Sequence, residues 1–198
     1  MVVRISEAME IPNEKDEASN LHLIDPKNLM IMETVENERL LLVTQKKTRR
    51  MDTMGITRSK MHFMYPEEAL YLVHTRTAIV KHFGTPLTLQ ESMNLLQYFE
   101  VPFYRFAIYK TLKKRGYIVR IVGDYYDIYS PVGFSLTKDL LNARYRIISQ
   151  RGSSMTCEEL RDQVKNATKD SNAAIVLAKF LNGSVSFFNV SSGIVTNL

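Results

Sequence analysis

Few side chains in this sequence have the types and spacing that catalysis would require. The one cysteine, Cys157, falls on the apolar face of a predicted helix, which favours a small packed side chain over a nucleophile. The four histidines, His22, His62, His74 and His82, are scattered, and none has a cysteine or histidine partner at metal-ligand spacing. The sequence also has no glycine-rich phosphate loop and no nucleophile-elbow motif, and no pair of carboxylates stands out as a catalytic pair. It therefore predicts no metal and no cofactor.

Phosphate binding is the chemistry that two short basic runs indicate. The runs are Lys46, Lys47, Arg49 and Arg50 in one place and Lys113, Lys114 and Arg115 in another. For the first run, a solvated loop and a nuclear-import signal are alternatives to phosphate contact. For the second, the alternative is stabilisation of the negative end of a helix. The net charge of +5 attracts phosphate backbones in general but is not specific evidence for nucleic acid.

Length and composition indicate an ordinary globular chain. Its 198 residues can bury a sizeable core in one domain with an extension, or in two small domains. A single cysteine cannot form an internal disulfide, so nothing suggests secretion. Glu7 stands where a signal peptide needs an apolar run, and no apolar run is long enough to cross a bilayer. We therefore expect no membrane partner.

Three helix starts stand in the middle of the chain. Pro66 suits the first position of a helix, where its missing N–H costs nothing. Thr88 and Glu91 form a capping box for a second helix. A third helix begins at Phe103 and ends in basic residues before Gly116, which suits a left-handed cap.

The second half of the chain predicts strands joined by tight turns. The predicted strands are residues 117–122, 125–129, 144–149, 173–180 and 184–190, and an earlier short strand is predicted at residues 39–43. Gly123-Asp124 and Asn182-Gly183 are hairpin signals, and Thr156 with Glu159 caps a helix between the third and fourth strands. This order predicts an α/β (α+β) fold, with a helical N-terminal region before a small mixed sheet. The predicted divisions are a mobile polar arm (1–32), a strand-plus-helices region (33–102) and an α/β domain (103–198).

Two motifs in this central stretch resemble a known family. One is the Pro-Glu-Glu-Ala-Leu helix start within Tyr65 to Val73, and the other is the basic-basic-Gly-Tyr helix end and strand within Tyr109 to Arg120. Together they resemble subunit fifty-four of the eukaryotic tRNA-splicing endonuclease, its larger non-catalytic subunit. The second motif is similar to all subunits of that enzyme, and the first points to this one. The resemblance covers about residues 40–190.

The resemblance implies a structural role in a nuclear, heterotetrameric enzyme that removes introns from precursor tRNA. The chain is expected to pair with a catalytic subunit, alongside the other structural subunit, and to help hold the tRNA. Catalytic subunits of the family use a tyrosine, a histidine and a lysine. The corresponding positions here hold Tyr129, Asn142 and Asn172, with Ala173 as the other placement of the last one. Because an amide cannot donate a titratable proton, we expect a nuclease-like domain without catalysis.

The last predicted strand is the expected contact with the catalytic subunit. It contains Val185, Phe187, Phe188 and Val190 and carries neither charge nor proline, which natural edge strands usually use to block pairing. The alternative is that the tail after it folds back over the edge. In relatives, an acidic turn between the last two strands docks into a partner. The turn here, residues 180–184, has no acid, which puts that contact in doubt.

Two other functions are compatible with parts of the pattern. Three helices and a hairpin between Tyr65 and Tyr129 also describe a winged-helix nucleic-acid-binding protein. An independent ribonuclease that uses Tyr129 is the other, although the missing histidine and lysine argue against it.

Overall fold

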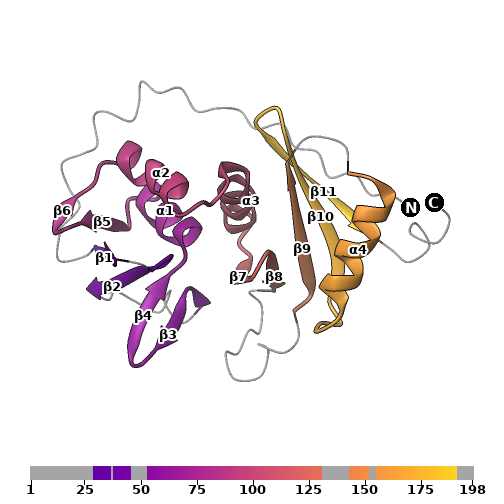
Figure 1. Cartoon of the computed structure of the whole chain (residues 1–198), viewed down its shortest axis with the longest axis horizontal. Coiled ribbons are helices and arrows are strands. Elements are labelled where there is room, and N and C mark those ends of the chain that lie inside the picture. The colour runs from indigo at the N-terminus through magenta and orange to yellow at the C-terminus, as the bar shows by residue number, and fades with distance from the viewer. Residues whose placement is uncertain (1–28, 37, 46–52, 131–142, 152–154, 191–198) are drawn as a thin grey trace. The chain divides into compact units, whose positions relative to one another are not determined.

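The described residues of the computed structural model form two compact units, which divide between Pro102 and Phe103 (Figure 1). The structure describes residues 29–36, 38–45, 53–130, 143–151 and 155–190. Residues 131–142, between the predicted strands 125–129 and 144–149, and residues 1–28 of the predicted arm lie outside these ranges. We call residues 29–102 the N-terminal unit and residues 103–190 the C-terminal unit.

The N-terminal unit is built on a six-stranded sheet in the order β3-β4-β2-β1-β5-β6. The strands are β1 (Met30–Thr34), β2 (Leu41–Gln45), β3 (Ile56–Arg58), β4 (Met61–Met64), β5 (Ala78–His82) and β6 (Thr85–Pro86). β1 pairs in parallel with β5, and the other neighbours are antiparallel. Helices α1 (Pro66–His74) and α2 (Leu89–Tyr98) pack against each other, and α1 packs on β5. The innermost side chains, Met32, Leu41, Met64, Leu72 and Val80, are each at most 2% exposed.

The prediction of a helical N-terminal region is therefore wrong. Its strands have only two to five residues, which is too short for an alternating pattern to stand out from the sequence. The β3–β4 turn also lacks a glycine signal, because Ser59 and Lys60 take its positive φ angles of 48° and 66°. Residues 30–32, the end of the predicted arm, lie in β1.

A buried carboxylate fixes the start of α1 in this unit. Glu68 is 1% exposed, and its Oε2 atom accepts hydrogen bonds from the backbone N–H of Gly55 at 2.9 Å and of Tyr65 at 3.1 Å. Gly55 has a φ of +67°, and a Cβ there would lie 2.2 Å from the carbonyl oxygen of Phe63. Only glycine fits this close approach of two backbones. The Pro66 helix start and the Thr88 helix start are both confirmed.

The C-terminal unit is a five-stranded sheet in the order β11-β10-β9-β8-β7. Its strands are β7 (Ile118–Val122), β8 (Tyr125–Tyr129), β9 (Tyr145–Arg151), β10 (Ala174–Leu181) and β11 (Ser184–Val190). β9 and β10 are parallel and the other neighbours are antiparallel. Both predicted hairpins are confirmed, as is the mixed α/β character of the chain.

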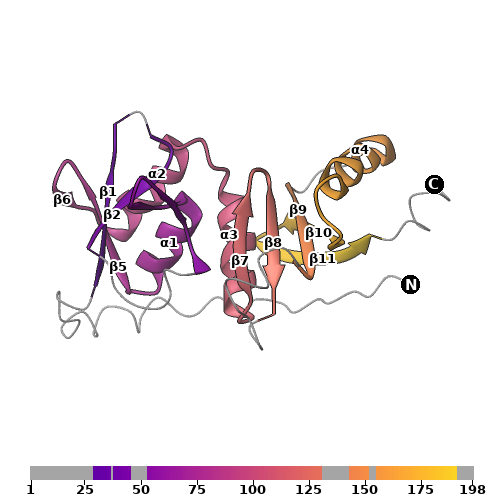
Figure 2. The same ribbon diagram turned by 90° about the horizontal axis from the view of Figure 1, so that it is seen from below.

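Helices α3 (Phe103–Lys114) and α4 (Cys157–Thr168) lie on opposite sides of this sheet (Figure 1). α3 lies beside the β7–β8 hairpin (Figure 2), where the hydroxyl of Tyr126 donates to the carbonyl of Arg105 at 3.1 Å. On the other face, Ala167 of α4 packs against Ile148 and Ile175. α3 therefore belongs to a different unit from α1 and α2, which disagrees with the winged-helix interpretation.

Candidate functional site

The structure describes two of the three positions that the resemblance aligns with catalytic residues. Tyr129 is the last residue of β8 and is only 4% exposed. Asn172 precedes β10 and is exposed. Ala173, the other placement of the third position, is 8% exposed. Asn142 lies outside the described residues.

The surroundings of Tyr129 make it a poor general base. Burial is the main cause that raises the pKa of its phenol above 10.0, and the negative charge of Asp127 raises it further. The cations Arg120 and Arg146 oppose this shift but do not reverse it. A phenol with a raised pKa remains protonated at neutral pH, and a base must be unprotonated to accept a proton. The side chain is also too buried for an RNA substrate to reach directly.

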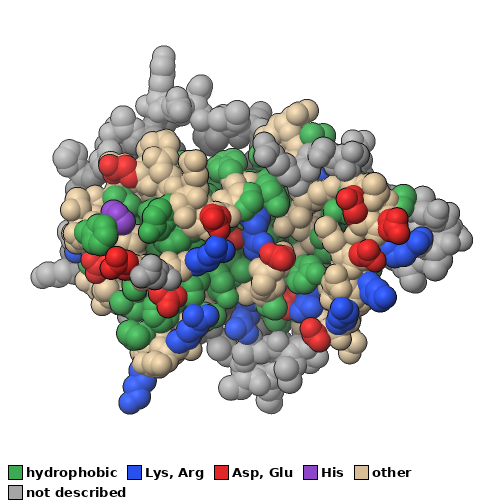
Figure 3. Space-filling view, viewed as in Figure 1, with side chains coloured by type: hydrophobic (Ala, Val, Ile, Leu, Met, Phe, Trp, Pro, Cys, Tyr) green, Lys and Arg blue, Asp and Glu red, His purple; other side chains and the backbone are tan. Residues whose placement is uncertain are grey.

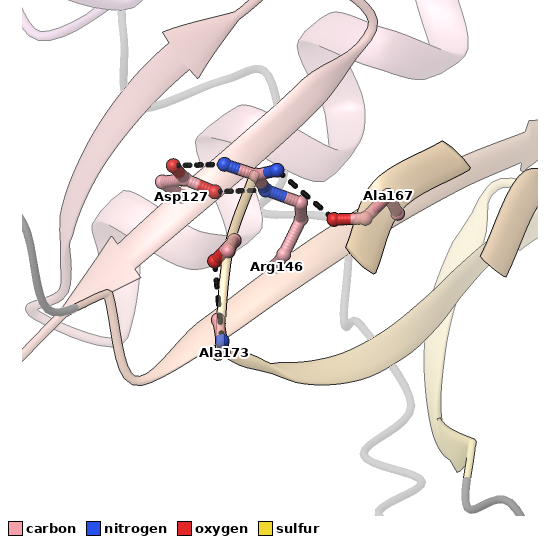
Figure 4. A network of polar contacts seen from close by, with 5 residues as sticks. Asp127, Arg146, Ala167 and Ala173 are labelled. Atoms are coloured by element: carbon pink, nitrogen blue, oxygen red, sulfur yellow. Dashed lines mark hydrogen bonds and ion pairs between the residues drawn. The ribbon is translucent and has the colours of Figure 1, made fainter. Parts of the chain in front are cut away.

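A buried ion pair joins Asp127 of β8 to Arg146 of β9 (Figure 4), and Asp127 lies two residues before Tyr129 on the same strand. The guanidinium of Arg146 donates to both carboxylate oxygens of Asp127, from Nε at 2.7 Å and from Nη2 at 2.8 Å. The two side chains are 7% and 8% exposed, and these hydrogen bonds raise the pKa of Arg146. Nη1 of Arg146 also donates to the carbonyl of Ala167 at 3.0 Å. The arrangement joins β8, β9 and the last turn of α4, and it has the geometry of a structural clamp.

No sequence motif marks this clamp. Asp127 and Arg146 are opposite each other in the β8–β9 register. The only signal for them was that both fall on strand positions where an apolar residue is usual. Close by, the backbone N–H of Ala173 donates to the hydroxyl of Ser171 at 3.1 Å, which shapes the approach to β10.

The predicted basic runs are only partly described. Lys46, Lys47, Arg49 and Arg50 lie outside the described residues. Lys113 and Lys114 occupy the last turn of α3, and Arg115 follows them. Lys114 and Arg115 are exposed, whereas Lys113 is half-buried. The guanidinium of Arg115 lies 4.9 Å from the ring centroid of Phe187 in β11.

A small pocket of about 140 Å³ opens beside Arg115, between α3 and the sheet. Its apolar lining consists of Leu112, Ile128, Ile147, Val176 and Phe187. Its polar lining consists of Arg115, Tyr117, Tyr145 and Asn189. Tyr145 also lies 5.3 Å below the guanidinium of the exposed Arg144, measured to the ring centroid.

The predicted interface residues divide between the two faces of β11. Within the described residues, β11 is at the edge of its sheet and pairs with β10 alone. Val185 and Phe187 are both 8% exposed. Phe188 and Val190 are half-buried, and Val190 packs against the Ile148 cluster under α4. The side chains are thus largely used within the chain, so an added strand would have to bind through the backbone edge of β11.

The part of the chain that the structure describes contains neither a candidate metal site nor a helix that could span a membrane. Those residues contain no group of three or more histidine, cysteine, aspartate or glutamate side chains placed to hold a metal ion. None of the helices among them combines the length and apolar character needed to span a membrane.

A known family matches part of the N-terminal half of the chain. The family model for the N-terminal region of tRNA-splicing endonuclease subunit sen54 matches residues 18–81. The matched range includes α1 and with it the helix start that follows Tyr65. It does not reach the C-terminal unit. None of the curated proteins compared with the chain matches it.

Proposed function

We propose that this chain, which belongs to the Sen54 family of tRNA-splicing endonuclease subunits, positions precursor tRNA for intron excision while paired with a catalytic subunit. Membership of the family makes it a structural, non-catalytic subunit of that enzyme. The match over residues 18–81 is the observation that carries this conclusion. Because tRNA splicing by this enzyme is a nuclear process in the family, we also propose that the chain acts in the nucleus.

The state of Tyr129 supports the non-catalytic role. Its phenol is buried, its pKa is raised, and the neighbouring Asp127 and Arg146 neutralise each other in a closed ion pair. Asn172 supplies no positive charge for a phosphorane. We therefore propose that the C-terminal unit is a nuclease-like domain that serves assembly and RNA positioning instead of cleavage.

The edge of β11 is our proposed contact with a catalytic subunit. Sheet edges expose backbone N–H and C=O groups that pair readily with another strand unless charge, proline or a cover prevents it. Residues 184–190 contain no charged residue and no proline. An antiparallel strand added beside β11 would extend the five-stranded sheet, which is the usual form of β-augmentation.

The two basic runs are the proposed contacts with tRNA phosphates. Lys114 and Arg115 are exposed at the end of α3, in a position to meet a phosphate backbone. Interaction with the helix dipole also stabilises cations at this position, so the two roles must be separated by experiment. Neutralising a residue that contacts phosphate reduces the slope of log affinity against log salt by about one. Neutralising a residue that only caps the helix leaves this slope unchanged.

Affinity purification tests the proposed function directly. The full chain, tagged and expressed in its natural cells, should recover the other subunits of the tRNA-splicing endonuclease, as identified by mass spectrometry. Recovery of those subunits together with precursor tRNA supports the proposal. Recovery of the chain without any endonuclease subunit, at native expression level, would contradict it.

A further inference from the structure

The pocket beside Arg115 has the size of a single aromatic ring. An apolar cavity of about 150 Å³ holds one benzene molecule. Pockets for cofactors and drug-sized ligands are about 300–1000 Å³. At about 140 Å³, this pocket has room for one ring of a nucleobase or an aromatic side chain, and it is too small for a whole nucleotide cofactor.

The polar groups of the pocket distinguish between these two rings. Tyr117 and Tyr145 bring hydroxyl groups, and Asn189 brings an amide that can both donate and accept hydrogen bonds. A pyrimidine base carries donors and acceptors on its edge that such groups can pair with. The ring of a phenylalanine would leave them without partners. The combination of an apolar lining and a polar rim therefore favours a base.

The charge around the pocket also favours a polynucleotide. None of the nine side chains that line the pocket among the described residues is acidic. The guanidinium of Arg115 lines it, Lys114 is exposed next to Arg115, and the exposed Arg144 lies over the ring of Tyr145. By contrast, acidic and basic side chains lie near one another over the outer surface of α4 (Figure 3), where Glu158, Arg161, Asp162 and Lys165 are exposed. Such a mixed surface gives phosphates no net attraction.

We infer that this pocket receives one unstacked base of the precursor tRNA, of pyrimidine size, while Arg115 and its cationic neighbours contact the flanking phosphates. Proteins read RNA sequence mainly at single-stranded loops and bulges, where bases can leave the stack and enter pockets. The inference rests on the proposed function, because it takes RNA as the ligand.

Binding of two matched oligonucleotides tests the pocket. Fluorescence anisotropy would measure the affinity of the full chain for a short oligouridylate and for an abasic ribose-phosphate strand of the same length and label. Both strands present the same phosphates, so a difference in affinity reports the bases. One captured base should give the uridylate strand an advantage of about tenfold.

Two substitutions at Asn189 separate pocket filling from surface effects. Asn189 is exposed on β11, so a larger side chain there can enter the pocket without disturbing the core. Asn189→Phe should abolish the preference for uridylate and leave the affinity for the abasic strand unchanged. Asn189→Ser leaves the pocket open and should retain most of the preference. Thermal melting of both variants establishes that they remain folded.

Two substitutions that each remove one positive charge complete the experiment. Arg115→Gln should weaken binding of both strands and reduce the salt slope by about one. Lys165→Gln removes the same charge from the exposed surface of α4 and should change neither quantity. Equal binding of both strands by the unchanged protein, or a preference that survives Asn189→Phe, overturns the inference.

Co-purification with endonuclease subunits distinguishes the remaining outcomes. If Asn189→Phe loses the catalytic subunit but keeps its preference for uridylate, the pocket holds a side chain of the partner, and the base assignment is wrong. If the unchanged chain recovers the other subunits but shows no base preference, only this inference fails. If it recovers no endonuclease subunit, the proposed function itself fails, whatever the RNA measurement shows.

Discussion

Tyr129 illustrates how the environment of a residue determines whether it can do chemistry. It occupies the strand end that the resemblance aligns with a catalytic tyrosine. Its burial and the neighbouring Asp127 both raise its pKa, so the phenol remains protonated at neutral pH. The resemblance aligns Tyr129 with a catalytic tyrosine, whereas its buried, protonated phenol is poorly suited to act as a base.

Replacing Tyr129 by phenylalanine should therefore leave cleavage by a reconstituted endonuclease unchanged at both splice sites. The ring remains, so packing is preserved, and only the hydroxyl is lost. General-base catalysis typically contributes about 100-fold to 10,000-fold in rate. A loss of that size in single-turnover cleavage of precursor tRNA, with assembly intact, would contradict the assignment of Tyr129 as a structural residue.

The Asp127–Arg146 pair should be the most sensitive polar contact of the C-terminal unit. Asp127→Asn leaves the buried guanidinium of Arg146 without its counter-charge, which typically costs about 3–5 kcal/mol of unfolding free energy. Urea denaturation measures this loss.

A second ion pair in the same unit, whose acidic partner is exposed, provides the control. Arg105 and Asp124 are 3.5 Å apart, and the side chain of Asp124 is 97% exposed. Asp124→Asn should therefore cost less than about 1 kcal/mol. Equal losses for the two substitutions would show that the buried pair is not a clamp.

At the scale of single elements, the hydrogen bonds of a helix cap also shift the pKa of a side chain. In α4, the N–H of Thr156 donates to Glu159 at 2.8 Å, and the N–H of Glu159 donates to the hydroxyl of Thr156 at 3.2 Å. These hydrogen bonds, first of all the one from the backbone of Thr156, lower the pKa of Glu159 below 4.5. A carboxyl group with a lowered folded-state pKa stabilises the protein above its unfolded-state pKa, and this contribution disappears as the pH falls through the folded-state value.

Glu159→Gln should consequently make the melting temperature less dependent on pH below about 4.5, the unperturbed value. At neutral pH the variant should melt at a lower temperature than the unchanged protein. At a pH below the lowered pKa of Glu159, the two melting temperatures should converge. Melting curves that stay separated by the same interval across this range would show that the cap makes no charge-dependent contribution.

The elements that the sequence predicted correctly are those with local signals. Thr88, Thr156 and Gly116 mark helix ends, and Gly123 and Gly183 take positive φ angles in the two hairpin turns of the C-terminal unit. Most strands of the N-terminal unit lack such signals because they are short, and the β3–β4 turn uses Ser59 and Lys60 in place of glycine. These strands are determined instead by packing between α1 and its neighbouring strands. Sequence periodicity does not show such packing.

The candidate sites likewise divide into positions that the sequence could predict and positions that it could not. The positions of Tyr129 and Asn172 followed from strand order along the chain. The Asp127–Arg146 clamp and the Arg115 pocket depend on the register of β8 with β9 and on how α3 lies against the sheet. These are relations between distant segments, and no local pattern encodes them.

At the scale of the whole molecule, the edge of β11 is the proposed route to assembly. Phe188→Asp puts a charge on the half-buried side of this strand, next to any strand that would pair with it. It should strongly reduce co-purification of the catalytic subunit. Leu181→Asp, at a 49% exposed position where β10 ends, serves as the control and should not. Recovery of the partner at normal yield by a folded Phe188→Asp chain would place the interface elsewhere.

Depletion and add-back in a cleavage assay is the measurement that tests the structural, non-catalytic role most directly. Precursor tRNA is incubated with this chain alone, with the other endonuclease subunits alone, and with all of them together. We predict no cleavage by the chain alone, impaired intron excision without it, and full excision on adding back either the unchanged chain or Tyr129→Phe. Cleavage by the purified chain alone, or normal excision in its absence, would contradict the account.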